Sequence, residues 1–103
     1  METVLSLDAV PIRLTDERWR HIVEEHSELS GLMFEVLETV SNPDEVLAGN
    51  FGERLAIRRI RPGKNLVVVY RENSPSDGFV ITAFLSRRTE WQKRRKKKWP
   101  SLS

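Results

Sequence analysis

The sequence predicts a single α+β domain in which two N-terminal helices pack on one face of an antiparallel sheet of about four strands. Two observations lead to this fold class. Apolar residues in the first half of the chain recur with the spacing of helices, whereas in the second half they alternate or run together as in strands. The length of 103 residues is that of one ordinary domain, which excludes separate cofactor and substrate domains.

The first half begins with a short predicted strand over residues 10–14. Thr15 is the expected N-cap of a helix over residues 16–26, because acidic residues follow it in the first turn. A clean apolar stripe then predicts a second helix over residues 32–40, which Pro43 prevents from continuing.

The second half is expected to supply the sheet. Strand patterns cover residues 45–48, 54–61, 66–71 and 79–85, and the sequence Pro-Gly-Lys-Asn at 62–65 is typical of a turn. Because consecutive strands joined by short turns usually pair, these segments predict an antiparallel meander.

The net charge of +2 conceals a strong asymmetry. Residues 1–53 carry three basic and twelve acidic residues, a net of −9, whereas residues 54–103 carry fourteen basic and three acidic residues, a net of +11. Six consecutive basic residues occupy positions 93–98. This distribution predicts a basic surface for a polyanion. We expect a domain over residues 1–88 followed by a basic C-terminal tail or helix over residues 89–103.

Several function classes are excluded by composition. The chain has no cysteine, so it has neither disulfides nor thiolate metal sites, and it lacks an apolar run long enough to span a membrane. His21 and Glu25 lie one helical turn apart, but a metal site needs a third ligand. We therefore expect a cytoplasmic protein with no metal site, no cofactor and no membrane contact.

Several stretches together resemble a known group of short proteins. They are His21-Ile22 with His26 beyond it, residues 38–46 (Glu-Thr-Val-Ser-Asn-Pro-Asp-Glu-Val), Gly52-Glu53, residues 66–70, and residues 78–84 (Gly-Phe-Val-Ile-Thr-Ala-Phe). The sequence is similar to the phage-type barnase, EndoU, colicin E5/D and RelE-like nucleases over about residues 12–88. This resemblance implies two helices on a curved four-stranded sheet and metal-independent endoribonuclease activity, often as the toxin beside a small antitoxin.

Metal-free RNA cleavage needs a group that accepts the 2′-hydroxyl proton and one that protonates the leaving oxygen, and histidine suits both roles. His21 and His26 are the two histidines, and both match positions of the resemblance. Five residues apart on a helix, they point about 140° apart, so one site accommodates only one of them. We prefer His26 because it lies at the end of an element; the alternative is a half-buried histidine that closes the helix.

Thr82 is a polar residue within an apolar strand, and it matches the Thr-Ala-aromatic motif of the resemblance. Its hydroxyl either donates to the scissile phosphate or is satisfied by local backbone. Tyr70 on the neighbouring strand would share the face of Thr82 if the connecting hairpin has even register, as a second hydroxyl or a base-stacking ring. Otherwise Tyr70 is an aromatic residue at the rim of the core.

Arginines provide the expected phosphate contacts. Arg58 and Arg59 point to opposite faces of their strand; the resemblance favours Arg58 as the functional one, and the register leaves Arg59 open. Arg87 and Arg88 follow the strand of Thr82, where they would hold phosphates. In the tail, further RNA contacts are expected from Lys93, Arg94 and Arg95, with Trp91 and Trp99 as stacking rings.

The leading hypothesis is an endoribonuclease toxin that cleaves RNA by 2′-hydroxyl transesterification, with His26, His21, Arg58 and Thr82 as catalytic candidates. Its partners would be RNA, as tRNA, mRNA or ribosome-associated RNA, and a small acidic antitoxin, and the protein would be a monomer or a homodimer. The alternative is a non-catalytic module that binds RNA or an antitoxin. A third hypothesis is a phage-derived protein that keeps the fold in a structural or regulatory role.

Overall fold

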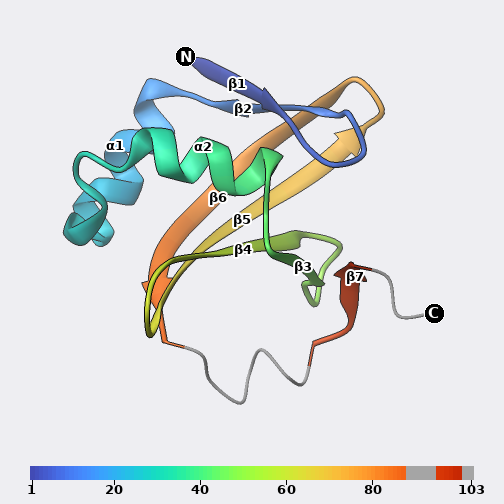
Figure 1. Cartoon of the computed structure of the whole chain (residues 1–103). Coiled ribbons are helices and arrows are strands. Elements are labelled where there is room, and N and C mark those ends of the chain that lie inside the picture. The colour runs from blue at the N-terminus through green and yellow to red at the C-terminus, as the bar shows by residue number, and fades with distance from the viewer. Residues whose placement is uncertain (88–94, 101–103) are drawn as a thin grey trace.

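The computed structural model describes residues 1–87 and 95–100 and shows an α+β fold in which one mixed sheet carries two helices on one face (Figure 1). The elements in chain order are β1 (Glu2–Leu5), β2 (Pro11–Leu14), α1 (Asp16–Glu25), a short 3-10 turn η1 (Ser27–Leu29), α2 (Met33–Ser41), β3 (Glu45–Ala48), β4 (Arg54–Arg61), β5 (Lys64–Ser74), β6 (Asp77–Ser86) and β7 (Lys97–Trp99). The strand order in the sheet is β1-β2-β6-β5-β4-β3-β7.

Both helices begin and end close to where the sequence predicts. The Thr15 hydroxyl accepts a hydrogen bond from the backbone N–H of Arg18, as an N-cap does, and acidic residues occupy the first turn of α1. The helix ends at His26, whose backbone N–H donates to the carbonyl of Ile22. The second helix, α2, stops at Asn42, immediately before Pro43.

Within the described residues the sheet has seven strands, so the expectation of about four is wrong in number. The antiparallel meander β3-β4-β5-β6 is as predicted, and β1, β2 and β7 extend it at both ends. Strand β2 pairs with β6 in parallel, through Ile12 with Gly78 and Arg13 with Phe79. A parallel pairing joins segments distant in the chain, and short edge strands carry little periodic pattern, so neither leaves a clear local signal.

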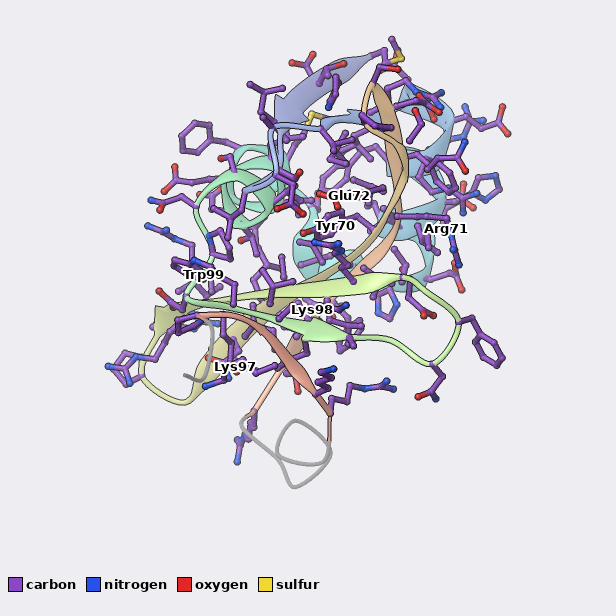
Figure 2. The ribbon with its side chains drawn as sticks, turned by 90° about the vertical axis from the view of Figure 1, so that its right-hand side faces the viewer. Tyr70, Arg71, Glu72, Lys97, Lys98 and Trp99 are labelled. Carbon is purple, nitrogen blue, oxygen red and sulfur yellow. The ribbon has the colours of Figure 1, made fainter. Side chains whose placement is uncertain are left out.

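Part of the segment expected to be a tail belongs to the sheet. Lys97–Trp99 forms β7, which pairs antiparallel with β3, and the Lys97 ammonium lies 3.5 Å from the Glu45 carboxylate. Figure 2 shows Lys97, Lys98 and Trp99 along this edge strand. A run of basic side chains does not prevent strand formation at a sheet edge, because charged side chains remain in solvent there. Residues 88–94 lie outside the described part of the chain, and with them the predicted contacts of Arg88, Lys93 and Arg94.

The core divides between the two faces of the sheet. On the helix face, Ile22 of α1 and Val36 and Val40 of α2 pack against the inward side chains of the sheet. The opposite face, which we call the outer face, carries a second apolar cluster. Its buried members are Leu47, Leu55, Ile57 and Val67, with Val69 and Phe84 packed against them. Among the described residues, no helix is long and apolar enough to cross a membrane.

Tyr70 lies on the helix face, in the core, and is almost fully buried. Of the two alternatives for Tyr70, the structure shows the one in the core and not the one that shares a face with Thr82. The pairing of β5 with β6 is shifted by one residue at this point: Val69 lies opposite Thr82, and Tyr70 lies opposite Val80. This bulge places one extra residue, Ile81, between the two pairs. Because Tyr70 is almost fully buried, its side chain cannot contact RNA. Tyr70 is a core residue.

Replacing Gly78 by Ala is expected to destabilise the protein by about 1–3 kcal/mol, as overpacking does in a filled interior. A Cβ atom at this position would lie 2.5 Å from the backbone oxygen of Arg71 and 2.5 Å from Cδ1 of Ile12, where β2 meets β6. Denaturant unfolding measures the effect, and Thr3→Ala on the exposed edge strand β1 is the control, expected to change stability by less than about 0.5 kcal/mol. Equal values for the two variants would contradict the close packing.

Tyr70 is the single tyrosine of the chain, so its titration can be followed directly. Burial raises the pKa of Tyr70 to about 12, with the Glu72 carboxylate adding to the rise and Arg54 opposing it. We expect tyrosinate absorbance to appear with a midpoint at about pH 12 in the native protein. In denaturant the midpoint should fall to about pH 10.

Because the pKa of Tyr70 is raised on folding, its contribution to stability is complete below about pH 10 and is lost as the pH rises towards 12. The Tyr70→Phe variant, measured in parallel, should show no tyrosinate signal and a flatter loss of stability over this range. A native midpoint near that of free tyrosine would contradict the buried hydroxyl.

Candidate active site on the outer face

Thr82 lies on the outer face, beside the apolar cluster. It is directly opposite Val69 of β5, which in turn is opposite Leu55 of β4, so these three side chains form one row across the sheet. Phe84, two residues further along β6, points to the same side. The predicted candidate Thr82 is therefore half-buried, on the face that neither α1 nor α2 covers within residues 1–87 and 95–100.

His26 lies where the end of α1 meets β6. Its imidazole ring is 6.1 Å from the ring of Phe84, centroid to centroid, and its Nδ1 atom lies 3.9 Å from a carboxylate oxygen of Glu28. About one third of its side chain remains exposed (33%). Phe84 and Thr82 lie two residues apart on the outward side of β6, so Phe84 is the neighbour that His26 and Thr82 share. A partly exposed imidazole in this position is accessible to a bound ligand.

His21 lies elsewhere on α1. Its side chain is exposed, and its one described ion-pair partner is Glu17 on the same helix, at 4.0 Å. The structure therefore keeps the two histidines apart. This separation is what their helical spacing predicts. Among the residues that the structure describes, no three histidine or carboxylate side chains gather closely enough to hold a metal ion.

Arg58 lies on the helix face and contacts α2. Its Nη1 donates to the carbonyl of Asn42, and its Nη2 lies 3.0 Å from the Glu38 carboxylate. Backbone carbonyls at a helix C-terminus lack helical partners and carry partial negative charge, so a guanidinium there stabilises the helix. The structure therefore gives Arg58 a role in holding α2, away from Thr82.

Arg59 occupies the alternate position on β4. Arg59 pairs with Asn65 of β5, and Asn65 in turn pairs with Ser86 of β6. These three residues form a row across the outer face, next to the row that contains Ile57 and Phe84. Its backbone N–H donates to the Asp44 carboxylate at 2.7 Å, while the residue is exposed. Of the two arginines that the sequence leaves open, Arg59 is thus the one placed on the side of Thr82.

Of the remaining predicted cations, the structure describes Arg87 and Arg95, which lie at two separate places. Arg87 is exposed just after β6 and lines a shallow groove of about 370 Å³ with Pro62, Gly63 and Lys64. Arg95 lies at the other edge of the sheet, where its Nη1 donates to the carbonyl of Ala48 at 3.3 Å and to Oδ1 of Asn50 at 3.2 Å.

Sequence reasoning missed the loop between β3 and β4, which borders the outer face. Within it, the Glu53 carboxylate accepts a hydrogen bond from the backbone N–H of Phe51 at 2.8 Å, and Arg71 of β5 donates to the carbonyl of Phe51 at 2.8 Å. The pKa of Glu53 is lowered, mainly by the hydrogen bond from Phe51. The available signal was an aromatic residue flanked by Asn50 and Gly52, because turn-forming neighbours on both sides predict that its ring lies at the surface.

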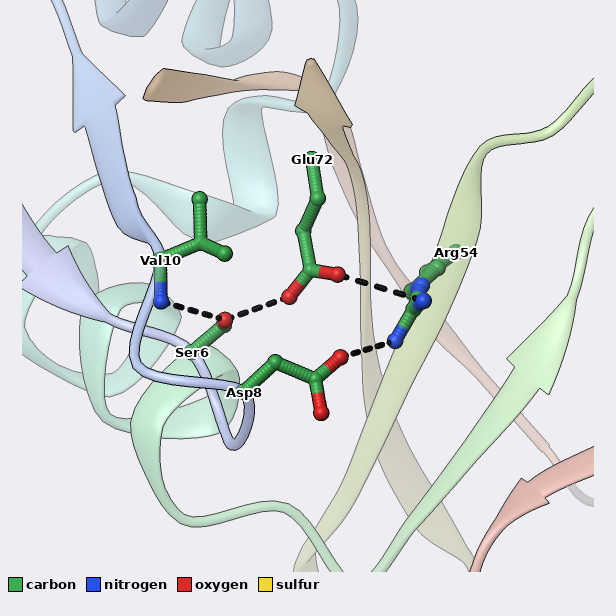
Figure 3. Close-up of polar contacts among 5 residues, drawn as sticks. All are labelled: Ser6, Asp8, Val10, Arg54 and Glu72. Carbon is green, nitrogen blue, oxygen red and sulfur yellow. Dashed lines mark hydrogen bonds and ion pairs between the residues drawn. The ribbon is translucent and has the colours of Figure 1, made fainter. Parts of the chain in front are cut away.

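A partly buried polar network ties the N-terminal segment to the sheet on the helix face (Figure 3). Arg54 contacts Asp8 at 2.6 Å and Glu72 at 3.2 Å, and Ser6 donates to Glu72 while accepting from the backbone N–H of Val10. Burial raises the pKa of Glu72, whereas Ser6 and Arg54 oppose the rise. In Figure 2, Tyr70 and Glu72 lie together while Arg71 between them points away. This network is structural and separate from Thr82.

We expect Arg58→Ala to lower the free energy of unfolding by about 1 kcal/mol, since both of its partners are partly exposed. Arg58→Lys should recover only part of the loss, because an ammonium cannot reproduce the two-point contact of a guanidinium. Arg59→Ala is the matched control. It removes the same charge at the adjacent position but keeps the hydrogen bond from the backbone N–H of residue 59 to the Asp44 carboxylate. Chemical denaturation measures all three, and equal losses for Arg58→Ala and Arg59→Ala would contradict the helix-clamping contact.

Comparison with known proteins identifies the family of the chain. The family model of the phage-Barnase-EndoU-ColicinE5/D-RelE like nuclease 2 matches residues 3–99, which spans the sheet from β1 to β7. No curated protein and no solved structure matches the chain. Since the family model covers nearly the entire chain, the protein belongs to the phage-Barnase-EndoU-ColicinE5/D-RelE like nuclease 2 family.

Proposed function

We propose that this protein is a metal-independent endoribonuclease that cleaves RNA by transesterification. The observation that carries the proposal is the position of His26, a partly exposed imidazole held against Phe84 at the edge of the strand that presents Thr82 on the outer face. Membership of a nuclease family supports a nucleic-acid substrate. RNA is the substrate expected for such chemistry, because its 2′-hydroxyl supplies the nucleophile and no metal-bound water is required.

In the proposed mechanism, His26 accepts the proton of the 2′-hydroxyl as the 2′-oxygen attacks the adjacent phosphorus. The bond from phosphorus to the 5′-oxygen breaks, and the leaving oxygen takes up a proton, from the imidazolium or from water. The products are a 2′,3′-cyclic phosphate and a 5′-hydroxyl end. Thr82 donates a hydrogen bond to a non-bridging phosphate oxygen, where negative charge develops. Arg59 and Arg87 bind flanking phosphates.

The biological role we propose is that of a cytoplasmic toxin whose activity an acidic antitoxin restrains. Support comes from the charge of the second half of the chain, since a basic RNA-binding surface also suits an acidic protein that covers it. tRNA, mRNA and ribosome-associated RNA all fit such a site.

Cleavage assays with chelator present test the proposal. His26→Ala should lower the rate by about 100-fold or more, as the loss of a general acid or base does, and Thr82→Ala by about 100-fold. His21→Ala is the matched control, since it removes a histidine from the same helix but from its exposed side, and should retain near-normal activity.

A substrate with 2′-deoxyribose at the cleaved position should remain intact, because it lacks the nucleophile. Wild-type protein that leaves RNA whole at high concentration and does not slow growth on expression would refute the enzyme. In that case the non-catalytic module that binds RNA or an antitoxin becomes the better description.

A further inference from the structure

Phe51 is the most exposed large apolar residue among those described, with 80% of its surface in solvent. It lies in the β3–β4 loop, residues 49–53, which we call the Phe51 loop. An aromatic ring is normally buried, because its transfer from water is favourable by a few kcal/mol, about 1.5–3. A single exposed ring has no meaning by itself, but Phe51 also lines a pocket on the outer face, so its ring is available to a ligand there.

The Phe51 loop is held rigidly by hydrogen bonds at both ends. Phe51 donates its N–H to Glu53 and accepts from Arg71 through its carbonyl, and the N–H of Gly49 donates to the carbonyl of Glu53 at 2.7 Å. Gly52 adopts φ +88°, which a side chain would strain. At Gly49 the Glu53 side chain occupies the space of a Cβ atom. Hydrogen bonds thus fix the backbone that carries the Phe51 ring.

Beside the Phe51 loop lies a pocket of about 370 Å³ on the outer face. Phe51 and Asn50 form one side of its lining, and Leu55, Val69 and Phe84 supply apolar side chains from three strands. Pockets that bind small ligands have volumes from about 300 Å³ upwards and mostly apolar linings, so this pocket has a suitable size and lining.

The pocket adjoins the candidate catalytic residues. Val69 in its lining is directly opposite Thr82, and Phe84 in its lining contacts the ring of His26. If a planar group occupies the pocket, the atoms bonded to that group can reach towards Thr82 and His26.

The charges around the pocket suit a nucleotide. The Glu53 carboxylate lies near the guanidinium groups of Arg71 and Arg95, which contribute to its lowered pKa and offset its negative charge. The local charge is therefore not repulsive to a phosphate, while the apolar lining offers a surface for a planar ring.

From this geometry we infer that the pocket binds one unstacked base of a single-stranded RNA, whose ring stacks on Phe51 and whose ribose and phosphate extend towards Thr82 and His26. The inference rests on the proposed function for the identity of the ligand. Single-stranded RNA is characteristically recognised by splayed bases that stack on aromatic side chains. A paired base in a duplex cannot enter, so the subsite selects unpaired RNA.

Binding of a 2′-O-methyl RNA octamer, which lacks the nucleophilic hydroxyl and stays uncleaved, tests the subsite separately from catalysis. Phe51→Ala should raise the Kd about 5- to 100-fold, as expected for one lost stacking contact. Phe51→Trp should restore binding to within about twofold, since any aromatic face can stack. Binding by the wild type should weaken strongly when the octamer is annealed into a duplex.

Phe34→Ala is the matched control, because Phe34 is the other highly exposed phenylalanine (70%) and lies on α2. Its Kd should stay within about twofold of the wild type. Equal effects of Phe34→Ala and Phe51→Ala, an unchanged Kd for Phe51→Ala, or no binding by the wild type would overturn the subsite.

The two proposals can fail independently. A protein that binds the octamer through Phe51 but leaves unmodified RNA intact would keep the subsite and refute the endoribonuclease. A protein that cleaves RNA equally well with and without Phe51, at substrate concentrations below saturation, would keep the endoribonuclease and refute the subsite.

Discussion

The alternation of side chains along β5 is the constraint on which the rest of this structure depends. This strand pairs with β4 on one side and β6 on the other, so its residues must divide between the two faces of the sheet. Leu66, Val68 and Tyr70 go under the helices, while Val67 and Val69 form the outer face. Both faces are consequently apolar. Helices cover one of them, and the other carries the pocket and the row that contains Thr82.

Charge is divided by the same alternation. The inward arginines Arg54 and Arg58 meet carboxylates from the acidic first half of the chain, because a cation turned towards the core needs a partner. Lys97 likewise meets Glu45. The contrast between an acidic and a basic half is therefore partly neutralised inside the fold. Arg59 alternates with Arg58 on β4, and its register places it in the row of Asn65 and Ser86 on the outer face.

Local pattern was sufficient for both helices and for the β3-β4-β5-β6 meander, since caps, prolines and periodicity are short-range signals. It was insufficient for β1, β7 and the parallel pairing of β2 with β6, which depend on partners far along the chain. The face of Tyr70 stayed open for a similar reason: one bulge residue in β6 decides whether Tyr70 or Val69 shares the face of Thr82, and nothing in the local sequence reveals this bulge. The Phe51 loop was overlooked because its shape comes from Arg71 and Glu53.

The sequence by itself determined the fold class, the two helices, the nuclease resemblance, and a short list of groups capable of proton transfer and phosphate binding. Tertiary structure alone decided which of these groups meet. His26 approaches the strand of Thr82 while His21 stays in solvent, and Arg58 holds α2 while Arg59 lies on the outer face. The physical reason is that residue type and spacing define chemistry and local geometry, whereas strand register and helix docking are set by the joint packing of the chain.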